Sequence, residues 1–209
     1  MPKDELNANL VWYLPHHPVT HPHKPGKVRV VFDCSATYRN NSLNESRLQG
    51  PDLISSLVGV LLRFRHEPIS IMAGIEALFL QVKVETRDQD LLHFLWWPEG
   101  KLYMPPAEYR MTVHLFGATS SPSCCNFALK KTATDNATEF APEVIKVVQR
   151  NFYVDDLLTS TSSEEKGIDL VQDLSTLLSK GGFKLTKWLS NSKAIEESFS
   201  PTERALTSR

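Results

Sequence analysis

The sequence has few cysteines, no long hydrophobic run and no excess of either charge. Only three of its 209 residues are cysteine, and two of these are adjacent, so a disulfide framework is excluded and a reducing compartment is expected. No stretch reaches the ~18 apolar residues that a membrane span needs, and the first residues lack the apolar core of a signal peptide. We therefore expect a cytoplasmic or nuclear location and no membrane partner.

Charge is nearly balanced, with 23 Lys and Arg against 24 Asp and Glu. Because domains that bind a phosphate backbone are often strongly basic, composition by itself argues against nucleic-acid binding. Apolar residues make up 41% of the chain and charged residues 22%, close to globular averages, which excludes a disordered, collagen-like or coiled-coil chain. The length favours a single domain, or one and a fraction.

The first 26 residues are rich in proline and histidine. These are Pro15, Pro18, Pro22 and Pro25, with His16, His17, His21 and His23. Prolines at this spacing block a helix and favour extended chain. Clustered histidines can bind a metal, but a proline-rich chain lacks the rigid spacing that a site needs. An irregular lead-in is therefore favoured over a metal site.

Beyond this lead-in, strands and helices alternate irregularly, which favours an α+β fold over a doubly wound sheet. Hydrophobic periodicity predicts strands at residues 27–33, 69–75, 81–84, 91–97, 109–114 and 183–188, with Val28, Val30 and Phe32 on one face of the first. Cap residues predict helices at residues 53–62 after Asp52, at 121–135, at 142–150 and from Ser163 to the glycines at 181–182.

Asp155 and Asp156 lie between two apolar half-strands, residues 152–154 and 157–158. This pattern predicts a tight hairpin with both carboxylates at its tip. An ordinary surface turn is the alternative, because Asp suits such turns. Since apolar residues lead directly into the acids, the pair is also expected on a buried sheet, where a cation would have to neutralise the carboxylates. Mg²⁺ prefers such oxygen ligands, and two metals ~3.5–4 Å apart support phosphoryl transfer.

Tyr153-Val-Asp-Asp156 resembles the Tyr-x-Asp-Asp box of reverse transcriptases, and other segments follow in the order of that family. Lys27-Val-Arg-Val-Val-Phe-Asp33 is similar to the fingers strand, Leu115-Phe-Gly-Ala-Thr-Ser-Ser-Pro122 to the loop and helix before the catalytic hairpin, and Gly181-Gly-Phe-Lys-Leu-Thr-Lys-Trp188 to the segment after it.

The residues of several motifs are similar to those of the reverse transcriptase of BEL/Pao-type LTR retrotransposons, and the resemblance covers roughly residues 10–195. These motifs are His21-Pro-His-Lys-Pro-Gly26, Val31-Phe-Asp-Cys-Ser-Ala36, Leu48-Gln-Gly-Pro-Asp-Leu53, Phe94-Leu-Trp-Trp-Pro98, Tyr109-Arg-Met-Thr-Val-His-Leu-Phe-Gly117 and Arg150-Asn-Phe-Tyr-Val-Asp-Asp156. The resemblance implies an RNA-directed DNA polymerase that uses Mg²⁺, dNTP and an RNA or DNA template–primer.

The implied architecture is a right-hand polymerase core of fingers and palm, with an antiparallel palm sheet and the thumb missing. Residues 1–26 would be the lead-in, 27–190 the fingers and palm, and 191–209 a truncated tail of a Pol polyprotein fragment. Association with other polyprotein segments is expected on the same basis.

The resemblance also assigns site residues. Asp155 and Asp156 would be catalytic acids and metal ligands, whereas the nucleotide-binding residues would be Lys27, Arg29, Phe79 and Gly117, with Pro122 near the pocket and Lys187 roughly at a late lysine that protonates pyrophosphate. Arg29 would bind nucleotide phosphate, and Phe79 would be the aromatic gate that excludes a ribose 2′-OH. From the residues alone, Lys27 is equally a solvated strand residue, and Phe79 is more simply a core phenylalanine.

The main departure from the family lies at Gly74. The family's palm strand carries Asp-Ile-Glu-Ala-x-Phe, whose Asp bridges both metals, but residues 74–79 here read Gly-Ile-Glu-Ala-Leu-Phe. Glu76 begins ~6–7 Å farther along a strand, too far for the ~2.1 Å ligation that Mg²⁺ requires. Loss of the ligand should raise the pKa of one remaining carboxyl.

We therefore expect an impaired polymerase, a pseudoenzyme with weakened Mg²⁺ binding. A non-catalytic nucleic-acid-binding remnant is the alternative, and an unrelated α+β protein with a plain Asp-Asp turn is a remote third. The balanced charge does not contradict the first two, because a polymerase cleft needs only local cations such as Arg29.

Overall fold

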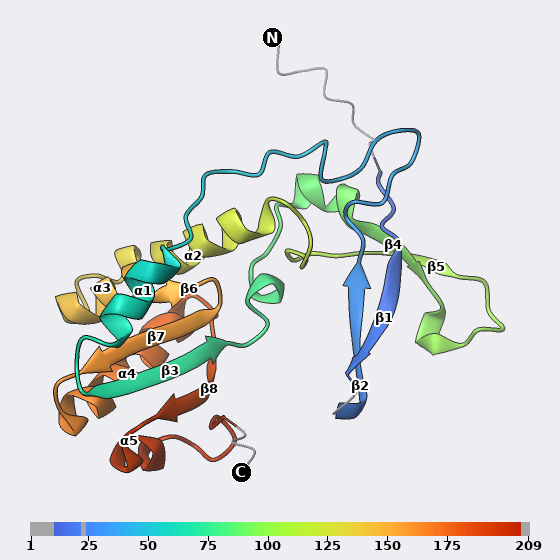
Figure 1. Cartoon of the computed structure of the whole chain (residues 1–209). Helices are drawn as coiled ribbons and strands as arrows, with labels where there is room; N and C mark the ends of the chain where they lie inside the picture. Colours follow the sequence, from blue (N-terminus) through green and yellow to red (C-terminus); the bar gives the residue numbers. More distant parts are fainter. Residues whose placement is uncertain (1–10, 22–23, 206–209) are drawn as a thin grey trace, which may run out of the picture. The chain divides into compact units, whose positions relative to one another are not determined.

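The computed structural model describes residues 11–21 and 24–205, and the chain divides into two compact units (Figure 1). The first unit consists of Met1–Gly50 and Val82–Ser121, and the second of Pro51–Gln81 and Pro122–Arg209. The boundaries expected at residues 26 and 190 stay predictions. Within the described ranges, no helix combines the length and apolar character that a membrane crossing requires.

The first unit is built from two separate antiparallel hairpins. One pairs β1 (His16–His21) with β2 (Lys24–Phe32), and the other pairs β4 (His93–Trp96) with β5 (Ala107–Arg110). Two 3₁₀ helices, η2 (Thr86–Leu92) and η3 (Pro98–Gly100), flank β4. The strands predicted at 27–33 and 91–97 are therefore confirmed.

The extended chain expected for the lead-in is observed at β1, although this part is a paired strand and not irregular. Pro18 lies opposite Val30 in this two-stranded sheet. A strand with one open edge tolerates proline when the missing N–H faces that edge. His16 packs among aromatic rings, 5.4 Å from Phe32 and 5.5 Å from Trp96 between centroids. The metal alternative includes His23, which lies outside the described residues.

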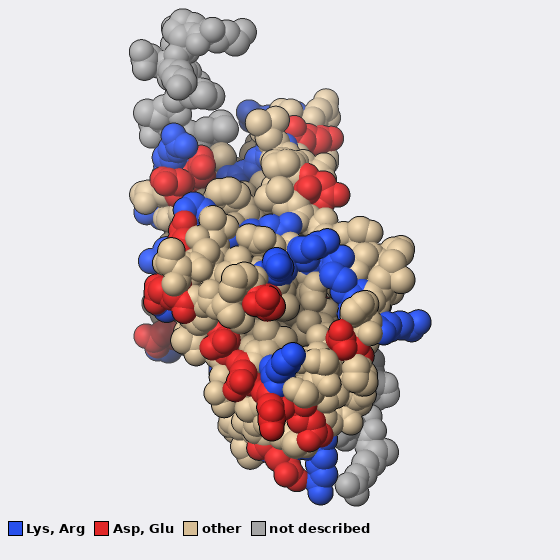
Figure 2. Space-filling model, turned by 90° about the vertical axis from the view of Figure 1, so that its left-hand side faces the viewer, with Lys and Arg blue, Asp and Glu red and all other residues tan. Residues whose placement is uncertain are grey.

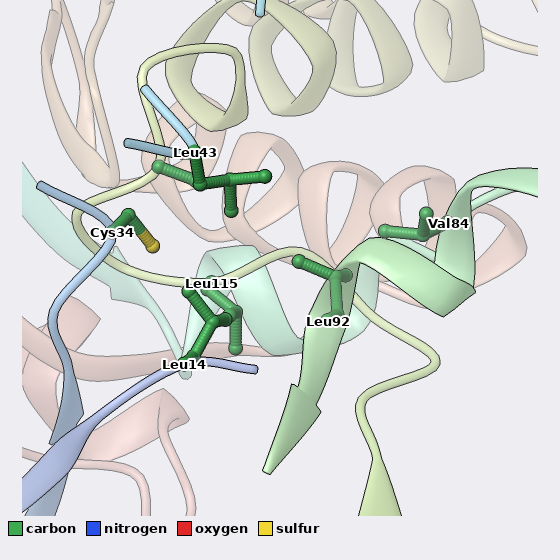
Figure 3. Close-up of a cluster of buried hydrophobic side chains, with 7 residues drawn as sticks. Leu14, Cys34, Leu43, Val84, Leu92 and Leu115 are labelled. Carbon is green, nitrogen blue, oxygen red and sulfur yellow. The ribbon is translucent and has the colours of Figure 1, made fainter. Parts of the chain in front are cut away.

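A cluster of buried side chains holds the first unit together, as Figure 3 shows. Its members come from segments far apart in sequence: Leu14, Cys34, Leu43, Val84, Leu92, Leu115 and Ala118. Burial, followed by the nearby Asp33 carboxylate, raises the pKa of the Cys34 thiol to about 11. This thiol therefore behaves as a small apolar core residue rather than as a nucleophile.

The second unit contains a four-stranded antiparallel sheet in the order β6-β7-β3-β8. Its strands are β3 (Ile69–Ile75), β6 (Phe152–Tyr153), β7 (Asp156–Thr161) and β8 (Leu185–Ser190). Its helices are α1 (Leu57–Phe64), η1 (Leu78–Gln81), α2 (Ser121–Asp135), α3 (Pro142–Arg150), α4 (Glu164–Lys180) and α5 (Lys193–Ser198). The α+β class expected from the sequence is confirmed.

Helix α4 shows why local sequence predicts several of these elements correctly. Its N-cap, Ser163, accepts a hydrogen bond from the Lys166 backbone N–H, and Gly181 caps its C-terminus. One face buries Val171 and Leu174, and the helix contacts β3 and β7. The helices predicted at 121–135 and 142–150 are also observed.

The helix predicted after Asp52 begins later, at Leu57. The Asp52 carboxylate accepts the backbone N–H of Ile54 at 3.0 Å, which forms a turn instead of a helix cap. Farther along the chain, Lys130 Nζ donates to the Leu53 carbonyl at 2.6 Å. This long-range bond holds the Leu53 carbonyl outside a helix, and it is invisible to periodicity.

The strand predicted at 81–84 is wrong, and the one predicted at 109–114 is displaced to β5 (Ala107–Arg110). Lys83 and Val113 form only an isolated bridge, supported by a hydrogen bond from the Val84 N–H to the Thr112 carbonyl at 2.9 Å. The chain after β5 thus changes partner from β4 to this short segment, so no continuous ladder forms.

Residues 191–205 pack onto the sheet unit. Ser192 caps α5 by accepting the Ile195 N–H, and Trp188 stacks on Phe199 with centroids 5.2 Å apart. The Trp188 N–H also donates to the Glu203 carbonyl at 2.9 Å. This segment therefore extends the edge of β8.

The contact between α4 and α5 yields a stability prediction. A Cβ at Gly167 would lie 2.3 Å from the Cδ1 atom of buried Ile195. We expect Gly167→Ala to lower the free energy of unfolding by about 1–3 kcal/mol, because overpacking outweighs the helix propensity of alanine. Urea denaturation followed by circular dichroism measures this loss.

Gly59→Ala in α1 is the matched control. The nearest atom to a Cβ there is Arg63 Nη1 at 3.2 Å, which needs to move by only a few tenths of an ångström. This variant should unfold at the same urea concentration as the natural chain or a higher one. A Gly167→Ala variant as stable as the Gly59→Ala variant would contradict the close packing of α4 on α5.

Candidate active site

The Asp155-Asp156 pair lies on a tight hairpin, as predicted. Tyr153 at the end of β6 pairs with Asp156 at the start of β7, so the loop consists of Val154 and Asp155. Val154 has φ 57°, a conformation that two-residue hairpin loops require but that β-branched residues rarely adopt. Backbone strain of this kind is concentrated at functional sites.

Strand β3 lies directly beside the hairpin. Gly74 pairs with Asp156 on β7 and, on the other side, with Thr186 on β8. The Ile75 N–H donates to the Asp155 carbonyl at 2.8 Å, which ties the loop to the sheet. Since side chains alternate along a strand, Ala73 and Leu157 bury the core face, whereas Gly74 and Asp156 share the opposite face.

The space at Gly74 is open toward the carboxylate. A Cβ built there would meet a single atom within 4 Å, Asp156 Oδ1 at 3.7 Å. Gly74 also lies outside the positive-φ region. The position that holds the first catalytic acid in the family's pattern therefore faces Asp156 and has room for a Cβ.

Asp156 is the electrostatically perturbed member of the pair. Partial burial, and then the neighbouring Asp155 carboxylate, raise the pKa of Asp156, and the Lys187 ammonium acts in the opposite direction. This is the direction expected for a partly buried carboxyl beside a second carboxylate.

Glu76 is engaged elsewhere. Its Oε2 atom lies 3.5 Å from Lys184 Nζ, and its backbone N–H donates to the Lys184 carbonyl at 2.9 Å. Across residues 11–21 and 24–205, no three His, Cys, Asp or Glu side chains come together as a set that could hold a metal ion. The side chains present therefore do not complete the three-carboxylate, two-metal site of the family's pattern.

The other candidate residues are divided between the units. Phe79 lies half-buried in η1, five residues after Gly74, and Lys187 lies on β8. Lys27, Arg29 and Gly117 belong to the first unit. Their proximity to the carboxylates remains a prediction, whereas Gly74, Asp155, Asp156 and Thr186 meet on one sheet.

In the first unit, Lys27 and Arg29 are exposed on β2 and share one face of the strand. Val28, Val30 and Phe32 alternate with them, as predicted, although the two valines are more than half exposed. Both cations are therefore accessible to an anionic ligand.

Sequence reasoning missed Asn44, which supports the loop around Gly117. Gly117 has φ 95°. Asn44 Nδ2 donates to the Gly117 carbonyl at 3.0 Å, and its Oδ1 atom accepts the Thr119 N–H at 2.9 Å. An asparagine in a loop carries no sequence signal for such a clamp, because the partners lie more than 70 residues apart.

Ser121 is the first residue of α2, and its side chain meets a buried histidine. Its Oγ atom lies 3.3 Å from His114 Nδ1, and both side chains are buried. Burial, and then the Arg47 charge, lower the pKa of His114. A neutral imidazole therefore anchors the segment that leads into α2.

The charge distribution on the surface is mixed. Figure 2 shows basic and acidic side chains interspersed over the face in view, with several acidic ones gathered toward its lower end. This agrees with the formal net charge of −1. A nucleic-acid ligand would therefore rely on local cations rather than on a uniformly basic face.

The raised pKa of Asp156 predicts a pH-dependent stability. The folded state binds the Asp156 proton more tightly than the unfolded state does. The free energy of unfolding therefore falls as the pH rises from the ordinary pKa of aspartate through the higher pKa of the folded state. Asp156→Asn should remove this loss and raise the free energy of unfolding at pH 7 by up to about 1 kcal/mol. The gain should shrink as the pH falls below about 4.

Urea denaturation at several pH values checks this prediction. Asp169→Asn, at an exposed position of α4, removes the same charge away from the hairpin and serves as control. If the natural chain were more stable than Asp156→Asn at pH 7, the carboxylate would be stabilised by its surroundings and the sign above would be wrong.

Comparisons with known proteins give a fold but no family. No protein-family profile and no curated protein matches the sequence. Foamy viral protease–reverse transcriptase in complex with double-stranded DNA matches with a TM-score of 0.60 and 18% identity, covering 83% of this chain and 26% of that one. Foamy viral protease–reverse transcriptase in complex with an RNA/DNA hybrid matches with a TM-score of 0.60 and 18% identity, covering 84% of this chain and 20% of that one.

The Prototype Foamy Virus protease–reverse transcriptase CSH mutant gives a TM-score of 0.62 at 18% identity, with 84% of this chain and 20% of that one covered. This chain therefore spans about a fifth to a quarter of the length of these proteins. At this identity the likeness establishes the fold: the chain has a reverse transcriptase-like fold of helices and antiparallel sheets.

Proposed function

We propose that this chain is a reverse transcriptase-like polymerase fragment that retains nucleic-acid binding and has lost most of its nucleotidyl-transfer activity. The first unit would supply the fingers and the second the palm. The observation that carries the proposal is the Tyr153-Val-Asp-Asp156 hairpin, paired with Gly74 of β3 in a reverse transcriptase-like fold.

Fold and motif support each other here. A Tyr-x-Asp-Asp sequence is short, and an 18% identical fold match alone assigns no activity. In this chain, however, the motif forms the hairpin between β6 and β7 of the four-stranded sheet, and its Asp156 pairs with Gly74 on β3. The surrounding motifs resemble those of BEL/Pao-type reverse transcriptases, which supports a retrotransposon polyprotein as the source of this chain.

The nucleic-acid ligand is supported by the solved relatives in fold. Two of them are complexes, one with double-stranded DNA and one with an RNA/DNA hybrid. For this chain we propose an RNA or DNA template–primer, with Lys27 and Arg29 as phosphate contacts and Phe79 as the gate beside the sugar of a dNTP.

The metal chemistry is where this chain departs from a working polymerase. Mg²⁺ would supply charge stabilisation for phosphoryl transfer. Asp155 and Asp156 are two suitable oxygen ligands, but Gly74 offers none and Glu76 pairs with Lys184. We infer that Mg²⁺ binding is weakened and catalysis impaired.

A non-catalytic nucleic-acid-binding remnant is the second candidate. It is favoured by the same glycine, because loss of one ligand affects metal binding without removing the exposed cations of β2. The two candidates differ only in residual extension activity.

Primer extension with Mg²⁺ tests the catalytic part. A Cβ at position 74 meets only an ordinary contact, and Gly74→Asp should raise extension by about 10²–10³-fold over the natural chain, the usual effect of one transition-state-stabilising group. Gly74→Asn has the same size without the charge and should give no increase. Robust extension by the natural chain, equal to that of Gly74→Asp, would refute the impairment.

Salt-dependent binding tests the ligand. Fluorescence anisotropy with a labelled template–primer should show an association constant that falls with salt, and Arg29→Ala should reduce the log–log slope by about 0.9. Lys146→Ala, at an exposed position of α3, removes the same charge and should leave the slope unchanged. Equal effects of both variants would contradict a specific role for Arg29.

A further inference from the structure

Lys187 occupies an irregular position on β8, beside the candidate site. Met72 pairs with Leu189 and Gly74 pairs with Thr186, so β8 has one more residue than β3 over this interval. Lys187 lies within this bulge and has φ 57°. Bulges of this kind redirect side chains and are common beside active sites.

The backbone conformation of Lys187 is unfavourable for lysine. Left-handed φ values are normal for glycine, asparagine and aspartate, and a glycine would adopt this one without steric cost. A residue held in such a conformation calls for a reason outside the backbone. Lysine at a bulge position that glycine would occupy without cost therefore points to a function for its side chain.

The surroundings of Lys187 indicate what that side chain does. Asp156, Gly74 and Thr186 form one row across three adjacent strands, and Lys187 directly follows Thr186. Leu185 and Trp188 are buried on the core face of β8, whereas Thr186 and Lys187 are not. The extra residue therefore places Lys187 on the same face of the sheet as Thr186, Gly74 and Asp156. Lys184, the other lysine near this end of β8, faces Glu76 instead.

We propose that Lys187 is a built-in counter-charge for the Asp155-Asp156 pair, and that with glycine at position 74 it makes the hairpin stable without a divalent cation. Two carboxylates and one ammonium leave one net negative charge at this end of the sheet. An aspartate at position 74 would leave two, and a bound divalent cation would then stabilise the fold.

This inference is independent of the proposed function, because it concerns folding and holds whether or not the chain binds nucleic acid. Its readout is the melting temperature of the full chain in EDTA and in 10 mM MgCl₂ at matched ionic strength. The natural chain should melt within about 1 °C in the two buffers, since a ligand stabilises only what it binds.

Gly74→Asp should melt lower than the natural chain in EDTA and gain about 3–6 °C in 10 mM MgCl₂, for a dissociation constant near 1 mM. Gly74→Asn, of equal size, should show no gain. A natural chain that gains as much as Gly74→Asp, or a Gly74→Asp variant indifferent to Mg²⁺, would overturn the proposal.

Variants of Lys187 separate charge from backbone. Lys187→Gly relieves the left-handed conformation, and Lys187→Met keeps it while removing the ammonium. Because both variants lack the ammonium, their melting temperatures should rise by at least about 2 °C in 10 mM MgCl₂. Lys187→Arg keeps a positive charge and should show no such rise. If neither Lys187→Gly nor Lys187→Met responds to Mg²⁺, the ammonium is no counter-charge and the proposal fails.

Discussion

Strand β3 is paired on both sides, and this double pairing determines the candidate site. Ile71, Ala73 and Ile75 are buried on one face, so the alternate face must carry Gly74 beside Asp156. A slip of one residue would expose this core and remove Gly74 from the carboxylates. The hydrophobic face of β3 therefore fixes the register on which the site's geometry depends. The hydrogen bond from the Ile75 N–H to the Asp155 carbonyl extends the same constraint into the hairpin loop.

Elements with local signals were predictable from sequence, and those set by distant partners were not. Pro142 and Ser163 mark helix starts through their own chemistry, and the helices begin there. Asp52 carries a similar cap signal, yet its carboxylate closes a turn because the neighbouring carbonyl is held by Lys130, far along the chain. The strand predicted at 81–84 is absent for a related reason. The chain that follows β5 contacts it only at an isolated bridge between Lys83 and Val113, so no ladder forms. In both cases, tertiary contacts override a correct local tendency.

The candidate site divides in the same way. The hairpin with both carboxylates at its tip followed from apolar residues that flank two acids. The role of Asn44 and the bulge at Lys187 had no local signal, because a clamp and a register shift are properties of paired segments. Lysine is in fact a poor predictor of left-handed backbone. Structural comparison adds the fold at 18% identity, and the family detail still rests on the motifs.

Glycine inside a strand usually marks a bulge or a close approach by another backbone. Gly74 satisfies neither condition, because its φ is not positive and a Cβ there would contact only Asp156 Oδ1, at an ordinary van der Waals distance. The extra residue of the neighbouring irregularity belongs to β8, not to β3. The fold thus tolerates glycine at this position but does not require it. What distinguishes position 74 is the carboxylate that it faces, so the consequence of glycine there is electrostatic: it leaves Asp155 and Asp156 with Lys187 as their charged partner.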